Sequence, residues 1–191
     1  EMEFHLLIKK EDGSYIPHDQ ASYYYIPPYD QGAEIRKELS HALDSMGIFC
    51  EKNNHEVPKG KHEINFQYSD ALSVADMTVT YKQVVKYIAH EKGLIATFMP
   101  KPFFGTYGCG MHVHLNLFDM EKGINLFSTG EDLEFSPIGA SFIAGLLDHA
   151  RSLTGITNPS VNSYKRLVPG WEAPVYVAWS KYNRSSLLRI P

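Results

Sequence analysis

The sequence predicts an α+β fold with a largely antiparallel sheet, and three observations favour it. Segments with strand-like and helix-like hydrophobic spacing are interspersed along the 191 residues. They do not follow the regular strand–helix–strand order that builds a parallel sheet. No glycine fingerprint of a dinucleotide-binding domain is present. A hydrophobic content of 43% and a charged content of 21% are those of an ordinary globular protein, so we expect one substantial domain.

The expected elements follow from hydrophobic spacing and from turn residues. We expect strands at residues 1–8, 48–50, 62–68, 94–99 and 111–118, with a further strand and loop in the tyrosine-rich stretch 13–30. Two helices are expected at residues 33–46 and 70–91, closed by Gly47 and Gly93. A third helix starts at Ser136 and Pro137 and carries apolar residues at core spacing as far as Leu153. Turns and short strands complete the chain.

Charge and composition exclude other kinds of protein. A net charge of -4 argues against a surface for nucleic acid or an anionic membrane, because a mildly acidic face would repel both. No apolar run approaches the roughly 18 residues of a membrane span, and no secretory leader opens the chain. Two cysteines, Cys50 and Cys109, do not make a disulfide framework, so we expect a reducing cytoplasm.

Both ends of the sequence lie in or beside strand-like runs. The chain begins with Glu1 rather than methionine, and Pro191 directly follows the strand-like residues 186–190. Native termini usually extend beyond the last ordered element. We therefore expect a single domain over residues 1–191 that is truncated at both ends.

Acids and histidines recur at positions that strands and turns can bring together. Glu1 and Glu3 lie on one side of the first strand, and Glu56 and Glu63 flank a turn at residues 58–60. His112 shares one face of a later strand with His114. A carboxylate-rich set with one imidazole favours magnesium or manganese over zinc. Each pattern alone is commonly an ordinary polar surface, and their coincidence leaves both interpretations open.

Basic residues gather in the last quarter of the chain, at Lys165, Arg166, Arg184 and Arg189. Arginine offers a fixed fork of donors to a carboxylate or a phosphate, although ordinary surface charge is the alternative. Metals together with arginines suit phosphoryl transfer, in which positioning and charge neutralisation do most of the catalysis. The glycine-rich loop at residues 105–110 lacks the lysine and serine of a P-loop, so it does not indicate a P-loop ATPase.

Several longer strings of residues resemble a known family. They are ATFMPKP at 96–102, GMHVH at 110–114, NSYKRLVPG at 162–170, EAP at 172–174, NRS at 183–185 and RIP at 189–191. In this order they resemble glutamine synthetase of the bacterial type, and the resemblance covers essentially the whole chain. It implies a curved, largely antiparallel sheet flanked by helices, similar to that of guanido kinases.

The resemblance also implies roles for individual residues. It assigns Glu3, Glu56 and Glu63 to the metal that activates glutamate, and Glu1 and His112 to a second metal that orients the nucleotide phosphates, either metal being Mg²⁺ or Mn²⁺. The further assignments are Arg166, Gly108 and Tyr107 for substrate binding; Glu51, Tyr68, His114 and Arg184 for the nucleotide; and Glu172, Arg184 and Arg189 for catalysis.

The implied reaction joins ammonia to glutamate in two steps. ATP phosphorylates the glutamate side chain, and ammonia then attacks the acyl phosphate from which water must be excluded. The family forms a homo-oligomer of two stacked hexameric rings, in which a neighbouring subunit's N-terminal domain completes each active site. We therefore expect the 191-residue chain alone to have little or no ligase activity.

Three residues depart from the family pattern. Tyr107 stands where asparagine is usual, Cys109 where serine is usual, and Lys61 where glutamine is common. The change at Tyr107 leaves open a relative that ligates another amine to glutamate. A non-catalytic relative and a metal-dependent hydrolase are further alternatives, but the retained acids and Arg166 argue against the first, and an acid-rich set argues against the open zinc site of the second.

Overall fold

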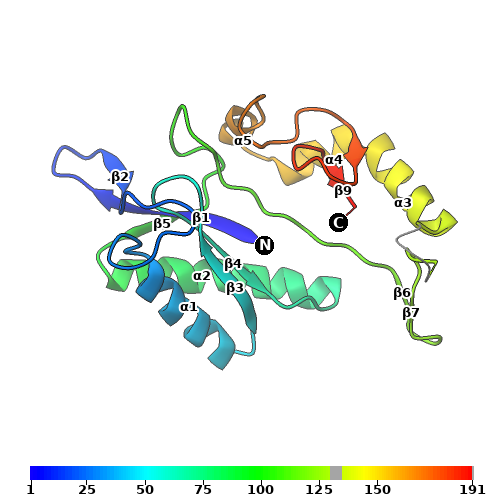
Figure 1. Ribbon diagram of the computed structural model, residues 1–191, viewed down its shortest axis with the longest axis horizontal. Helices are drawn as coiled ribbons and strands as arrows, with labels where there is room; N and C mark the ends of the chain where they lie inside the picture. The colour runs from blue at the N-terminus through cyan, green and yellow to red at the C-terminus, as the bar shows by residue number, and fades with distance from the viewer. Residues whose placement is uncertain (130–134, 191) are drawn as a thin grey trace. The chain divides into compact units, whose positions relative to one another are not determined.

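The structure is a computed structural model that describes residues 1–129 and 135–190 (Figure 1). The backbone divides into two compact units, Glu1–His112 and the residues from Val113 onward. Each unit has strands and helices of its own. In the part of the chain that the structure describes, no helix combines the length and the apolar character that a membrane crossing requires.

The first unit contains one antiparallel sheet and two helices. Its elements are β1 (Met2–Lys9), β2 (Tyr15–Pro17), α1 (Ala33–Ser45), β3 (Cys50–His55), β4 (Lys61–Phe66), α2 (Ala71–Glu91) and β5 (Ile95–Thr97). The strand order is β2-β1-β4-β3, and β5 pairs with β1. Every pairing in this sheet is antiparallel, which confirms the predicted fold class.

Strand β1 is the centre of this sheet. Its first half, Met2–His5, pairs with β4, and its second half, Leu7–Lys9, pairs with β2. Strand β5 pairs with residues His5–Leu7. The isolated bridge between Met2 and Met111 brings the segment after the glycine-rich loop back alongside β1.

The hydrophobic core lies between one face of the sheet and the two helices, as Figure 1 shows for the first unit. Alternate residues of a strand point to opposite faces, so Met2, Phe4 and Leu6 enter this core and are at most 2% exposed. The other face of β1 carries Glu1, Glu3 and His5. The alternation therefore separates the apolar side of the strand from its acidic side.

The two helices end as the sequence predicts. Asp70 caps α2 by accepting hydrogen bonds from the backbone amides of Leu72 and Ser73, at 3.1 and 3.0 Å. Gly47 and Gly93 follow the helices with φ of +80° and +71°, a conformation that costs glycine little and other residues more.

The second unit contains short elements. They are β6 (Phe118–Asp119), β7 (Ile124–Asn125), α3 (Pro137–Asp148), α4 (Ala150–Thr157), α5 (Val161–Arg166), β8 (Trp179–Ser180) and β9 (Leu188–Arg189). The pair β6–β7 is antiparallel and the pair β8–β9 is parallel. Ser136 caps α3 by accepting from the amide of Gly139 at 3.0 Å, which confirms the predicted helix start.

The strand predicted at residues 111–118 is wrong. Met111 makes an isolated bridge, and the next strand, β6, begins only at Phe118. Alternation builds a strand only where a partner strand and a covered face are present. Val113, Leu115 and Leu117 are 59%, 53% and 41% exposed, so their side of the segment is not packed into a core.

Two details of the later helices also differ from the prediction. The predicted long helix is divided at His149, whose backbone (φ -92°, ψ 5°) leaves helical geometry, so that α3 ends and α4 begins there. Helix α5 was not predicted. Its six residues are too few to show a helical hydrophobic period, although Ser160 caps it by accepting from the amide of Ser163.

Candidate active site and metal-binding clusters

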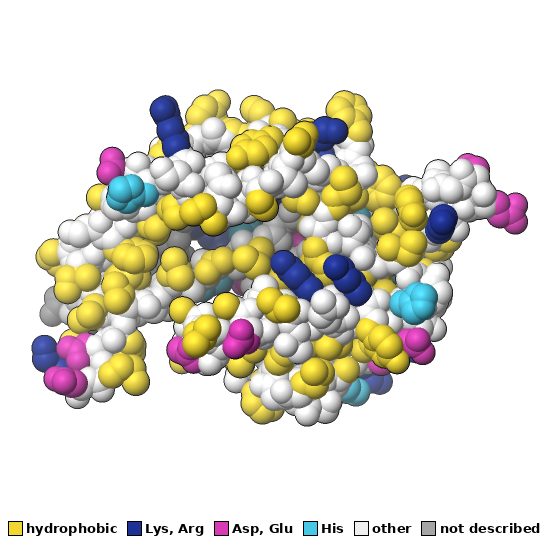
Figure 2. Space-filling model, turned by 180° about the vertical axis from the view of Figure 1, so that it is seen from behind, with side chains coloured by type: hydrophobic (Ala, Val, Ile, Leu, Met, Phe, Trp, Pro, Cys, Tyr) yellow, Lys and Arg dark blue, Asp and Glu magenta, His cyan; other side chains and the backbone are white. Residues whose placement is uncertain are grey.

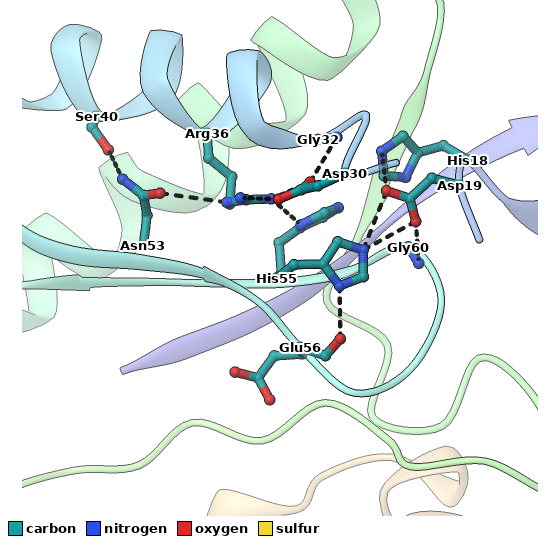
Figure 3. Close-up of polar contacts among 11 residues, drawn as sticks. His18, Asp19, Asp30, Gly32, Arg36, Ser40, Asn53, His55, Glu56 and Gly60 are labelled. Atoms are coloured by element: carbon teal, nitrogen blue, oxygen red, sulfur yellow. Dashed lines mark hydrogen bonds and ion pairs between the residues drawn. The ribbon is translucent and has the colours of Figure 1, made fainter. Parts of the chain in front are cut away.

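The hairpin of β3 and β4 presents different chemistry on its two sides. His55 is paired with His62, and Glu63 is paired with Glu3 of β1. Because side chains alternate, the two histidines face the helices and Glu63 faces the opposite side. Glu56 follows β3 directly, and its carboxylate points away from the histidine rings (Figure 3). The turn thus places the acids of the hairpin together.

Three carboxylates form the acidic cluster, defined as Glu3, Glu56 and Glu63. Each offers an oxygen atom, and these atoms all lie within 4.8 Å of one another. The three residues are only 6% to 8% exposed. Burial, together with the neighbouring charges of Glu56 and Glu3, raises the pKa of Glu63 to about 7. A set of buried carboxylate oxygens fits a hard divalent cation such as Mg²⁺ or Mn²⁺.

Two polar side chains that sequence reasoning did not assign to the site also contact this cluster. The Lys61 ammonium lies 2.7 Å from Oε1 of Glu3. The Tyr23 hydroxyl donates a hydrogen bond of 2.7 Å to Oε2 of Glu56, and burial and this carboxylate raise the pKa of Tyr23. Lys61 could have been found from its spacing, since it lies two residues before Glu63 on one strand. Tyr23 lies in an irregular segment that carries no such signal.

A second cluster adjoins the first and consists of Glu1, Glu63 and His112. One ligand atom from each lies within 4.8 Å of the others. His112 Nδ1 is 3.3 Å from Oε2 of Glu1, and the His112 amide donates to the Glu1 carbonyl at 3.0 Å. Glu63 belongs to both clusters, so the two sets of candidate ligand atoms are adjacent. All five residues that the sequence assigned to metals are therefore brought together in one unit.

A buried histidine network lies on the helix side of the same hairpin (Figure 3). Arg36 of α1 forms a two-pronged ion pair with Asp30, with N–O distances of 3.0 and 2.7 Å. Its Nη1 also lies 2.9 Å from Nδ1 of His62. A guanidinium can only donate, so Nδ1 of His62 accepts and its proton resides on Nε2.

His55 is a second cationic group of this network, beside Arg36. Its Nδ1 donates to the backbone carbonyl of Glu56 at 2.7 Å, and its Nε2 donates to the carboxylate of Asp19 at 3.0 Å. Since both ring nitrogens face acceptors, the ring is held as an imidazolium. Burial alone would lower the pKa of His55, but these hydrogen bonds outweigh burial and raise it. Asp19 also accepts from the amide of Gly60 at 3.0 Å and so fixes the turn.

Close His and Asp atoms also occur around Asp19, but their hydrogen bonds favour a structural role over metal binding. Asp19 belongs to two groups whose ligand atoms lie within 4.8 Å of one another. The first also contains His18 and His62, and the second also contains Asp30 and His55. A metal-binding histidine usually donates its second nitrogen to an acceptor, whereas that of His62 faces a guanidinium. The network therefore anchors the backbone of Glu56 and of the turn at residues 58–60. The acidic cluster on the opposite face of the hairpin remains the candidate metal site.

The remaining predicted site residues lie in several segments. In the first unit Gly108 is buried, Tyr107 is half-buried, and Glu51 and Tyr68 are exposed. In the second unit Arg166 ends α5 and is half-buried. The other predicted residues of that unit are exposed: His114, Glu172, Arg184 and Arg189. Pro191, the last residue of the RIP string, lies outside the described residues.

The first unit is a mixed domain of helices and antiparallel sheet that carries two adjacent clusters of candidate metal ligands. The family model "glutamine synthetase, catalytic domain" matches residues 1–191. The chain is 44% identical over 191 residues to the glutamine synthetase of Methanococcus maripaludis. The chain belongs to the glutamine synthetase family, which is a family of ligases.

Solved structures agree with this assignment. Plasmodium falciparum glutamine synthetase matches 98% of the chain with a TM-score of 0.87 and 28% identity. Ligand-free GmaS matches 99% of the chain with a TM-score of 0.79 and 39% identity. The chain spans 43% of the M. maripaludis protein and 42% and 44% of the two structures, which is less than half of each.

The histidine network gives a prediction about stability. Arg36→Met leaves Asp30 and His62 buried without their donor, and we expect a loss of about 3–5 kcal/mol in the free energy of unfolding. Lys92→Met is the matched control, because the Lys92–Glu38 pair is more than 40% exposed on both sides and should cost about 0–1 kcal/mol. Urea denaturation followed by circular dichroism measures both. Equal small losses would contradict a structural role for the network.

The acidic cluster gives a prediction about pH. Without divalent cations, Glu63 titrates near pH 7 in the folded chain and near its ordinary 4.5 in the unfolded chain. Between these values the folded state binds more protons, so the free energy of unfolding falls as pH rises from about 4.5 to 7. Glu63→Gln should remove this component, and saturating Mn²⁺ should remove it from the unsubstituted protein. Urea titrations in EDTA, repeated across this pH range, measure the free energy of unfolding of both proteins. The same dependence of this free energy on pH in Glu63→Gln and in the unsubstituted protein would contradict the prediction.

Proposed function

We propose that the full-length protein is a glutamine synthetase that joins ammonia to glutamate at the expense of ATP, through a γ-glutamyl phosphate intermediate. The observation that carries this proposal is the adjacency of the two clusters, which share Glu63, in a chain of this family. The chain would be a catalytic domain of a longer protein, because it spans less than half of its relatives.

The acidic cluster would hold one Mg²⁺ or Mn²⁺, and Glu1 and His112 would hold a second. When bound, the two cations would offset negative charge on the ATP phosphates and on the accepting carboxylate. The residues of this chain orient the ligand oxygens. Tyr23 fixes the carboxylate of Glu56, and the amide of Gly110 donates to Oε2 of Glu3.

The residues of the second unit would bind and neutralise the substrates. Arg166 would clamp the glutamate carboxylate, and Arg184 and Arg189 would neutralise the transferring phosphoryl group, since guanidinium forks match both anions. Glu172 would close the site and accept a proton from ammonium. The remaining proposed contacts are Gly108 and Tyr107 to the amino acid, and Glu51, Tyr68 and His114 to the nucleotide.

The backbone of Glu172 supports a functional role. Its φ is +50°, and among the described residues other than glycine only Tyr24 shares a positive φ. A non-glycine residue in this region costs about 1–3 kcal/mol, and such strain clusters at active sites. The strain would aim the carboxylate in a direction that an ordinary conformation does not reach.

The exposed apolar surface supports an oligomer. Exposed hydrophobic side chains are visible at many places in Figure 2. Large ones are Phe104 and Tyr68 in the first unit and Tyr182 in the second, each at least 90% exposed. Extensive apolar exposure marks surfaces that another chain segment or subunit covers. We propose that the intact protein is a cytoplasmic homo-oligomer of two hexameric rings, which would cover this surface.

A second candidate function is ligation of glutamate to another amine. Tyr107 favours it, because asparagine is usual at this position and the tyrosine side chain is larger and only half-buried. The acidic cluster and the phosphoryl step would be the same for both functions, so only the acceptor amine separates them.

The full-length protein tests the function directly. We expect ATP- and Mg²⁺-dependent formation of glutamine from glutamate and ammonia, with much slower turnover of methylamine or ethylamine. Glu63→Gln should abolish both reactions, and residues 1–191 alone should show little or no activity. Turnover with an amine but not with ammonia would establish the second candidate function instead.

Glu172 gives a separate prediction. Glu172→Asn keeps a residue that tolerates positive φ but removes the carboxylate. We expect kcat of the full-length protein to fall by about 100-fold or more, as for loss of a catalytic acid–base group. The melting temperature should be unchanged or higher. Unchanged kcat in this variant would exclude the carboxylate from catalysis.

A further inference from the structure

A lysine side chain lies within the acidic cluster. The register between β1 and β4 pairs His5 with Lys61 and Glu3 with Glu63, so Lys61 is a diagonal neighbour of Glu3 on the same face of the sheet. The Lys61 ammonium is 2.7 Å from Oε1 of Glu3. Both side chains are buried, with exposures of 6% and 8%. The pair is therefore a buried ion pair inside a set of candidate metal ligands.

The charge of Lys61 matters because the neighbouring histidines contact other groups. His5 faces the same side, but its Nδ1 lies 3.0 Å from Sγ of Cys109. His112 contacts Glu1. Glu56 accepts a hydrogen bond from the Tyr23 hydroxyl, and Glu63 lies beside both Glu3 and Glu56. Lys61 thus supplies positive charge to a set of buried carboxyl groups.

A divalent cation in the acidic cluster would compete with this ammonium. A cation bound by all three carboxylates must take an oxygen of Glu3, whose Oε1 contacts Lys61 and whose Oε2 accepts from the amide of Gly110. Two cations a few ångströms apart in a buried site repel each other strongly. Lys61 either leaves Glu3 or remains as a repulsive neighbour, and both weaken binding of the metal.

We propose that Lys61 is an internal counter-cation of the acidic cluster, which stabilises the cluster without metal and lowers its affinity for the divalent cation. The inference rests on the proposed metal site and adds a residue that sets the affinity of that site. Occupancy of the acidic cluster then depends on the free concentration of Mg²⁺ or Mn²⁺ instead of being permanent.

Titration of the full-length protein with Mn²⁺ tests this proposal. Lys61→Gln removes the charge and retains polar length. We expect it to bind Mn²⁺ more tightly by about 10-fold or more, on the scale of the effects that groups around metal ligands have on affinity. Lys61→Arg keeps the charge and should not tighten binding. Lys92→Gln removes a charge from an exposed pair and should leave the affinity unchanged. Isothermal titration calorimetry measures each dissociation constant.

A second measurement does not depend on the affinity of the unsubstituted protein. In EDTA, Lys61→Gln should melt at a lower temperature than the unsubstituted protein. Mn²⁺ should raise its melting temperature by more, because at a given concentration a ligand that binds more tightly stabilises the folded state more. If Lys61→Gln folds only when Mn²⁺ is present, its dependence on the metal for stability supports the proposal in the same way.

The outcomes separate this inference from the proposed function. Equal or weaker Mn²⁺ binding by Lys61→Gln, or tighter binding by Lys61→Arg, would overturn the role of Lys61. The metal site would still be supported in that case if Glu63→Gln lost Mn²⁺ binding. Mn²⁺ binding that survives unchanged in both Glu63→Gln and Lys61→Gln would overturn the metal site itself, and the inference with it.

Discussion

The antiparallel register between β1 and β4 is the constraint on which the candidate site depends. It sets Glu3 opposite Glu63 and Lys61 diagonal to Glu3. A shift of one residue would turn the carboxylates toward the core and the core residue Phe4 toward the acidic side. The register is held by burial of Met2, Phe4 and Ile64 against α1 and α2. The hydrophobic core thus fixes the positions of charged groups that it does not contact.

Buried charges on the two faces of the hairpin are balanced separately. On the helix side, Arg36 balances Asp30 and the His55 imidazolium balances Asp19, and both pairs have short hydrogen bonds. On the other side three carboxylates face one lysine. The charges of the first set are thus paired within the chain. The second set has more carboxyl groups than cationic partners, and the crowding of these acids raises the pKa of Glu63.

The sequence predicted β1, α1, β4 and α2 of the first unit well, because their hydrophobic periods are long and their ends are clear. The strand expected at residues 48–50 shares only Cys50 with β3. Asp70, Gly47 and Gly93 mark helix ends through local chemistry alone. The strand at 111–118 was wrong because alternation says nothing about whether a partner strand is present. Glu56 and Glu63 could be placed together from their turn, whereas the contacts of Lys61 and Tyr23 depend on cross-strand register and on an irregular segment. The family resemblance thus assigned the candidate ligands, and neither it nor the local patterns assigned Lys61 or Tyr23 to their surroundings.

We propose that the β1–β4 register builds a divalent-cation site from Glu3, Glu56 and Glu63. Anomalous diffraction at the manganese edge, from crystals of the full-length protein grown with Mn²⁺, tests this site. We expect one anomalous peak within bonding distance of these three carboxylates and a second beside Glu1 and His112. Absence of a peak at the acidic cluster, or a peak instead among the histidines around Asp19, would contradict it.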